Sequence, residues 1–231
     1  MIEQMVFDLP PDTAFGRDDF LVSEANSAAV ARIEAWRNWP QNKLVLSGPA
    51  GSGKSHLARI WTEAAGATAI PATELPGADL TALAGTWAGV AVEDVHEAGP
   101  EAQRALFHLH NLCGQDARLL LMTGRGNSAA WAGALPDLAS RIAAALEVRV
   151  GAPDENLLGA LFVKLFDDRQ LQVAPHVLRQ MLLHSERSFA FVMELVNRLD
   201  KFALAKKSGV TRKLVSDVFK EMRQEDGQTA P

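Results

Sequence analysis

Eight consecutive residues near the start of the chain constrain its fold more than any other feature. They read Gly48, Pro49, Ala50, Gly51, Ser52, Gly53, Lys54 and Ser55. This spacing matches G-x-x-x-x-G-K-[ST], the phosphate-binding P-loop. The glycines let successive backbone N–H groups point into one concavity that holds an anion, and the lysine adds a mobile positive charge. The motif therefore predicts a loop that binds the phosphates of ADP or ATP.

The neighbouring residues supply the context that this motif requires. Residues 43–47 form an apolar run that predicts a buried strand, and residues 56–65 have a helical composition that stops before Gly66. A helix that begins near Ser55 directs its positive dipole end at the bound phosphates. We expect His56, directly after the motif, to join its eight residues in contacting the nucleotide.

Composition excludes several classes of protein. The chain has 231 residues, of which 48% are apolar, so it can build a proper core. It has no apolar run of about eighteen residues, so no membrane span is expected. Its single cysteine, Cys113, and the absence of a signal-peptide pattern fit the cytoplasm. A net charge of −5 argues against a protein that coats nucleic acid by itself.

Strands that alternate with helices predict an α/β fold, with a parallel sheet and helices on both faces, over residues 20–150. Within it, Ser23 is expected to cap a helix that continues to Arg37. Residues 151–223 predict a small all-helical domain, with helical runs at 154–168, 175–185, 188–206 and 211–223. We expect residues 1–19 to be irregular and the polar tail 224–231 to be disordered.

Two carboxylates follow the apolar run at 89–92, namely Glu93 and Asp94. Such a pair after a P-loop resembles the Walker B motif, in which one acid holds the Mg²⁺ water shell and its neighbour orients the attacking water. Ser55 and Glu93 are therefore the expected Mg²⁺ ligands. Glu93 stands where Asp is usual, which predicts slow hydrolysis. Thr123 ends the strand predicted at 118–123, where such ATPases place a polar residue that senses the γ-phosphate.

Arg141 closes the segment 135–141, which reads Leu-Pro-Asp-Leu-Ala-Ser-Arg. An arginine near a helix end fits a finger that reaches the γ-phosphate of a neighbouring subunit, although an exposed helix charge remains an open alternative. The histidines, by contrast, show no metal-ligand spacing and are expected to be surface or packing residues.

Together, the P-loop, the Walker B pair, Thr123, Arg141 and the helical lid resemble AAA+ ATPases of the DnaA clade. Within that clade, the segments 120–124 and 135–141 are similar to the Hda-type regulators that work with the sliding clamp. The resemblance implies that Phe20, Leu21 and Val22 line the adenine pocket. It also implies that the segment Gln4–Leu9 is a clamp-binding peptide, in which Gln4, Met5, Phe7 and Leu9 make the contacts.

The resemblance implies a regulator of replication initiation that, with the sliding clamp, promotes hydrolysis of the ATP bound to the DnaA initiator. A homo-oligomer is a further open possibility. The chain ends without the helix-turn-helix domain of DnaA, so no intrinsic DNA-binding domain is expected. Alignment places Ala190 where relatives carry a lid arginine called sensor 2, so intrinsic hydrolysis should be weak or absent. Whether Arg187 substitutes is open. The alternative function is an adaptor or helicase loader that does not stimulate hydrolysis.

Overall fold

The structure is a computed structural model that describes residues 20–206 and 209–228. The strands are β1 (Lys43–Ser47), β2 (Thr68–Pro71), β3 (Gly89–Glu93), β4 (Leu119–Gly124) and β5 (Leu146–Arg149). The α-helices are α1 (Ser27–Glu34), α2 (Lys54–Ala65), α3 (Leu80–Thr86), α4 (Pro100–Gln115), α5 (Pro136–Ala144), α6 (Glu155–Asp168), α7 (Pro175–His184), α8 (Phe189–Lys206) and α9 (Arg212–Gln228). Short 3₁₀ helices are η2 (Trp36–Asn38), η3 (Pro40–Asn42), η4 (Ala72–Gly77), η5 (Val95–Glu97) and η6 (Ser128–Ala130).

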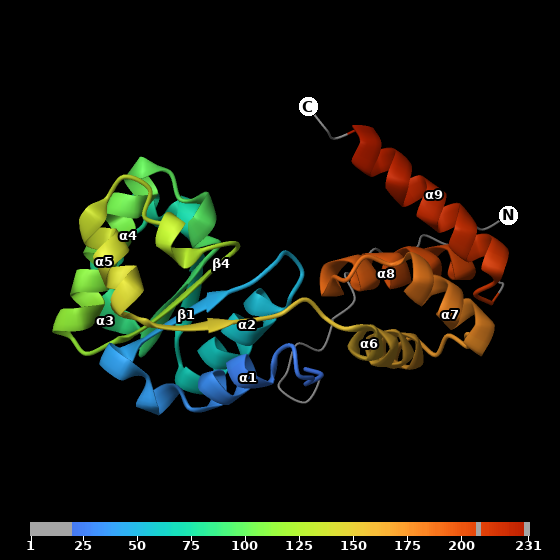
Figure 1. The fold of residues 1–231 in the computed structure, drawn as a ribbon, viewed down its shortest axis with the longest axis horizontal. Helices are drawn as coiled ribbons and strands as arrows, with labels where there is room; N and C mark the ends of the chain where they lie inside the picture. The colour runs from blue at the N-terminus through green and yellow to red at the C-terminus, as the bar shows by residue number, and fades with distance from the viewer. Residues whose placement is uncertain (1–19, 207–208, 229–231) are drawn as a thin grey trace, which may run out of the picture.

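The five strands form one parallel sheet in the order β2-β3-β4-β1-β5, with helices on both faces (Figure 1). Successive side chains of a strand point to opposite faces. Val90 and Val92 of β3 therefore pack in the core that α4 and α5 cover, whereas Ala91 packs in the core that α1 and α2 cover. This arrangement confirms the predicted α/β fold class. It also explains the continuous apolar runs, because both faces of the sheet are buried.

Helices α6 to α9 form a separate layer beside the sheet, the lid (Figure 1). Their apolar faces meet in a core of their own, which includes Phe162, Met181, Val196 and Phe219. One parallel bridge between Val173 and Val210 joins the loops that precede α7 and α9. The lid and the sheet thus have distinct cores. None of the described helices is long and apolar enough to cross a membrane.

The start of the first helix differs from the prediction. Helix α1 begins at Ser27, after Asn26, and ends at Glu34, so Ser23 is not its cap. Instead, the buried side chain of Asn26 folds back, accepting from Ser23 N at 2.9 Å and donating to Leu21 O at 2.9 Å. These bonds hold residues 21–26 in a turn.

The end of the chain also differs from the prediction. We expected disorder from residue 224, but α9 continues to Gln228. Its apolar face, with Leu214, Val218 and Met222, anchors the helix on the lid core. The polar residues that follow include good helix formers such as Glu and Gln, so polarity alone did not indicate a disordered segment.

Candidate functional site

The P-loop connects the end of β1 to the start of α2. Gly51 and Gly53 adopt positive φ values of 62° and 92°, in the region that glycine enters without steric cost. Gly48 lies close to Val150, the residue after β5, so an added Cβ would overlap the carbonyl oxygen of Val150. Gly48 N also donates to Gly124 O at 3.2 Å. The glycines therefore have specific geometric roles, and the loop is fixed between β4, β5 and the N-terminus of α2.

Lys54 is only 7% exposed, and its ammonium group lies over this loop. Its Nζ donates to Gly48 O at 3.0 Å, to Pro49 O at 2.7 Å and to Ser52 Oγ at 3.4 Å. Burial lowers the pKa of Lys54, while the carboxylate of Asp94 raises it and the positive charge of Arg125 lowers it. Since burial disfavours the charged form, an anion held in the loop would stabilise this ammonium.

A cavity of about 600 Å³ lies between the P-loop and the lid helices α6 and α8. This volume is within the range of sites for small molecules and cofactors. Residues of the sheet domain form one wall and apolar and charged lid residues form the other. The lining residues are Phe20, Leu21, Ala50, Gly51, Ser52, Gly53, Lys54, Ser55, His56, Asp94, Arg125, Leu161, Lys164, Leu165, Asp168, Arg169, Phe189, Ala190 and Met193.

The predicted nucleotide contacts meet in this cavity with three exceptions. Residues 50–56 line it, whereas Gly48 and Pro49, at the start of the loop, are not part of the wall. Phe20 packs edge-to-face on His56, with ring centroids 5.0 Å apart, which gives the cavity an aromatic end. Leu21 also lines it, but Val22 is 49% exposed and does not. An aromatic and apolar end beside a P-loop suits a nucleotide base.

Of the two Walker B carboxylates, the structure places Asp94 in the cavity wall, while Glu93 ends β3 and is not among the lining residues. Asp94 has a left-handed backbone, with φ of 52°, which turns the chain out of the sheet. Thr123 is 1% exposed, and its Oγ1 accepts from Asp94 N at 3.4 Å. In this structure Thr123 therefore orients the turn that carries Asp94, rather than facing the cavity itself.

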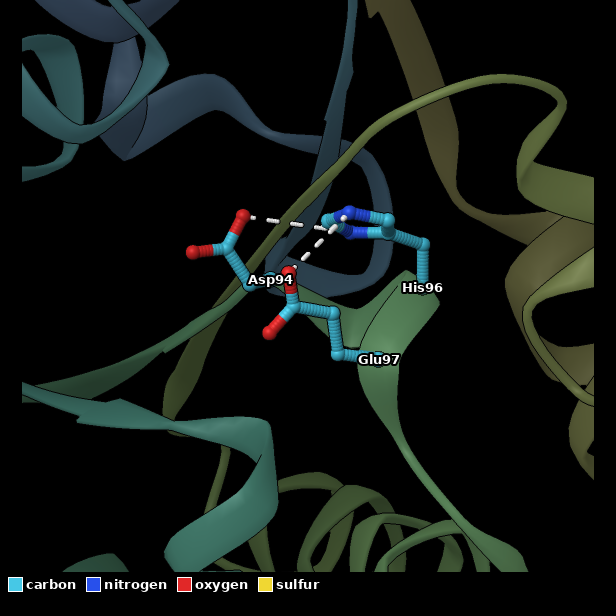
Figure 2. A group of neighbouring side chains, drawn as sticks. All are labelled: Asp94, His96 and Glu97. Carbon is cyan, nitrogen blue, oxygen red and sulfur yellow. Dashed lines mark ion pairs between the residues drawn. The ribbon is translucent and has the colours of Figure 1, made fainter. Parts of the chain in front are cut away.

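Asp94 also belongs to a group of side chains that the sequence did not predict. His96 lies between Asp94 and Glu97, with Nδ1 3.8 Å from Asp94 Oδ1 and Nε2 3.6 Å from Glu97 Oε1 (Figure 2). All three ligand-type atoms lie within 4.8 Å of one another. The histidine thus packs against the carboxylate that enters the cavity. The sequence did not predict a histidine in such a group. The side chains of residues 94, 96 and 97 come together through the 3₁₀ turn η5, which the sequence pattern did not indicate.

The donors present fit Mg²⁺. Mg²⁺ prefers oxygen ligands and is usually held by one or two protein groups together with substrate phosphates. Ser55 and Asp94 both line the cavity and supply a hydroxyl and a carboxylate. Glu93, the predicted ligand, is not in the wall, so the geometry favours Asp94 for this role.

Arg141 lies on α5, away from the cavity. The helix buries Leu138 and Ile142 against the sheet domain and leaves Arg141 exposed. The guanidinium carbon is 5.5 Å from the centroid of the Phe107 ring on α4, within the range of a cation–π contact. Arg141 therefore does not contact the cavity of its own chain. The position is compatible with both a finger that acts on another molecule and an exposed helix charge.

The lid contributes charges that sequence reasoning missed. Ala190 lines the cavity, while Arg187 is exposed and is not in the wall. Lys164 of α6 and Arg169, directly after α6, line it instead, as does Arg125 after β4. The place of Arg125 could have been anticipated, because it follows the strand that ends in Thr123 and the carboxyl ends of parallel strands meet at one edge. The proposed clamp contacts Gln4, Met5, Phe7 and Leu9 lie outside the described residues.

Solved structures of similar fold include replication initiation proteins and a Holliday junction branch migration motor. Domain III of the Thermotoga maritima replication initiation protein DnaA superposes with a TM-score of 0.78 at 17% identity, covering 92% of this chain and 98% of that one. AMPPCP-bound DnaA from Aquifex aeolicus gives 0.71 at 15% identity, covering 93% and 71%. The Thermotoga maritima RuvB Holliday junction branch migration motor gives 0.67 at 14% identity, covering 89% and 71%.

No protein-family model and no curated protein matches the sequence. At the identities given above, the structural similarity establishes the fold and nothing finer. The chain has the P-loop AAA+ fold, with a five-stranded parallel sheet and a helical lid.

Proposed function

We propose that this protein binds ADP or ATP with Mg²⁺ and regulates replication initiation as an Hda-type partner of a DnaA initiator. In this proposal the sliding clamp holds the segment Gln4–Leu9, and Arg141 completes hydrolysis of the ATP bound to the initiator. Initiator converted to the ADP form is then inactive. The fold shared with domain III of DnaA supports a protein that docks on DnaA, because AAA+ domains of one kind can pack against one another in the same way.

The observation that carries the proposal is the separation of two features on one chain. Lys54, Ser55 and Asp94 converge on a nucleotide-sized cavity, whereas Arg141 is exposed on α5 and does not line it. An arginine finger supplied in trans needs such a placement, since its target is a phosphate on another molecule. In other P-loop enzymes a finger is worth about 10³–10⁵ in rate.

Intrinsic hydrolysis is proposed to be slow. Glu93 is not in the cavity wall, and the lid presents the methyl group of Ala190 rather than an arginine. The bound nucleotide then acts chiefly as a structural ligand that fixes the lid on the P-loop.

The test is turnover of ATP preloaded on purified DnaA, with the clamp assembled on DNA. Wild-type protein should accelerate hydrolysis, and Arg141→Ala should lose the acceleration while still binding nucleotide. Arg104→Ala, an exposed arginine on α4, is the matched control and should behave as wild type. A variant that lacks residues 1–9 should lose clamp association and, with it, the acceleration.

The alternative is an adaptor or helicase loader that recruits partners without stimulating hydrolysis. The presence of a AAA+ fold in RuvB, a branch migration motor, favours keeping this second candidate, because the fold by itself serves different machines. In the turnover assay an adaptor would bind the clamp or DnaA and leave the rate unchanged, with Arg141→Ala equal to wild type.

A further inference from the structure

The cations around the cavity differ in whether they are already paired. Lys164 forms an ion pair with Asp168 at 2.9 Å. Arg169 donates to Asn197 Oδ1 at 2.6 Å and lies 3.8 Å from Asp200. Within the described ranges, Arg125 has no carboxylate partner and no hydrogen bond to its guanidinium. In a chain with a net charge of −5, an unpaired arginine in a cavity wall is available to a negatively charged ligand.

The backbone that carries Arg125 is held beside the P-loop. Strands β1 and β4 pair in parallel with Ser47 opposite Gly124, so Arg125 leaves the sheet next to the first residue of the loop. Gly124 O accepts from Gly48 N at 3.2 Å, and Arg125 O accepts from the indole Nε1 of Trp131 at 2.7 Å. The Cα position is therefore fixed on both sides.

Arg125 and Lys54 line the same cavity, so a ligand held there is in reach of both positive charges. Two cations in one cavity wall are stabilised together by a multiply charged anion. A guanidinium can bind phosphate oxygens through two parallel N–H donors, which an ammonium cannot do.

We propose that Arg125 binds the outermost phosphate of the nucleotide and so makes the site discriminate nucleoside triphosphates from diphosphates. This inference rests on the nucleotide binding proposed above. It assigns to the sheet side of the cavity a charge that the lid lacks at Ala190. Arg125 is a specificity-determining residue in this scheme, while Lys54 binds both nucleotides.

The test is the ratio of affinities for ADP and for AMPPCP, a non-hydrolysable ATP analogue, measured by calorimetry with Mg²⁺. Charged hydrogen bonds of this kind are worth enough to change affinity by about tenfold or more. Arg125→Ala should therefore weaken AMPPCP about tenfold or more and ADP less than about threefold. Arg125→Lys should recover only part of the loss, because it keeps the charge but not the planar fork.

Two control variants make the result specific. Arg104→Ala removes an exposed arginine from α4, away from the cavity, and should leave both affinities unchanged. Arg187→Ala removes the lid arginine that could have replaced the one missing at Ala190. The inference is overturned if Arg125→Ala keeps the wild-type ratio, or if Arg187→Ala is the variant that selectively loses AMPPCP.

Failure of this inference is distinguishable from failure of the proposed nucleotide site. If wild-type protein binds neither ADP nor AMPPCP, the site itself is refuted. If wild type binds both, Lys54→Ala binds neither and Arg125→Ala keeps the wild-type ratio, the site stands and only the role of Arg125 is refuted.

Discussion

The lid touches the P-loop at Gly51, and this contact can be tested quantitatively. Phe189 N, at the start of α8, donates to Gly51 O at 2.8 Å. An added Cβ at Gly51 would overlap Ser188 Oγ, and Gly51 has a φ of 62°. We therefore predict that Gly51→Ala destabilises the protein for two separable reasons, namely backbone strain and collision with the lid.

The two contributions can be assigned magnitudes. A left-handed backbone costs a residue other than glycine about 1–2 kcal/mol. Overlap in a packed contact costs about 1–3 kcal/mol in addition. Ser188→Gly removes the colliding side chain and costs only a few tenths of a kcal/mol as a helix cap, although it loses the bond from Phe191 N to Ser188 Oγ at 3.3 Å. The double variant Gly51→Ala/Ser188→Gly should therefore recover about 1–3 kcal/mol.

The measurement is a double-mutant cycle on free energies of unfolding. Unfolding in urea is monitored by circular dichroism, in the absence of nucleotide. Gly53→Ala is the matched control in the same loop. Its φ of 92° imposes strain, but an added Cβ would meet Phe20 and Phe189 at ordinary distances of 3.4 and 3.5 Å. Gly53→Ala should thus lose stability without any coupling to Ser188→Gly.

The reasoning fails if Gly51→Ala and Ser188→Gly are additive within about 0.5 kcal/mol, the value found for independent sites. Additivity would mean that the lid does not rest on the loop in the nucleotide-free protein. Equal coupling of Gly51→Ala and Gly53→Ala to Ser188→Gly would also contradict this reasoning. In the structure, an added Cβ would collide with Ser188 at Gly51 and not at Gly53.

Three further predictions concern other parts of the chain. Lys54→Ala should abolish binding of ADP and ATP in calorimetry, because the phosphates lose the buried ammonium of the loop. Burial, with the positive charges of Lys43 and Arg141, lowers the pKa of His110 to about 4. The unfolded chain therefore takes up a proton on this histidine before the folded protein does, and the free energy of unfolding should fall by about 3 kcal/mol as pH drops from about 6.5 towards 4. In urea unfolding at several pH values, His110→Leu should flatten that slope and the exposed His108→Gln should keep it. Phe107→Leu, which removes the ring beside Arg141, should reduce DnaA-ATP turnover less than Arg141→Ala does, and equal losses would argue against a direct role for the arginine.

The fold could be predicted where local signals are strong. Residues 43–47, 89–93 and 119–123 are apolar runs followed by loop residues, and each is a strand buried on both faces. Strand β5 was not predicted. It pairs only with β1, at the sheet edge, and its residues alternate between half-buried and exposed, so its sequence lacks a continuous apolar run.

The sequence predicted the part of the site that comes from one continuous segment, the P-loop. The P-loop residues from Ala50 onward line the cavity as expected. The choice between Glu93 and Asp94 depends on a left-handed turn at Asp94, which the sequence does not indicate for a residue that is not glycine. Arg125 and Lys164 come from distant segments that meet only once the strands and the lid are placed.

The residues on the two sides of the cavity differ in whether they can respond to the number of phosphates on a bound nucleotide. The lid contacts the loop through the backbone N–H of Phe189, and that bond depends on loop geometry rather than on the number of phosphates. Under the proposal for Arg125, the group that responds to a third phosphate lies on the sheet side. The backbone carbonyl of Arg125 accepts a hydrogen bond from the indole of Trp131, which lies between η6 and α5 in sequence. If Arg125 binds a third phosphate, this hydrogen bond would connect the backbone of that residue to the segment that leads into α5 and Arg141.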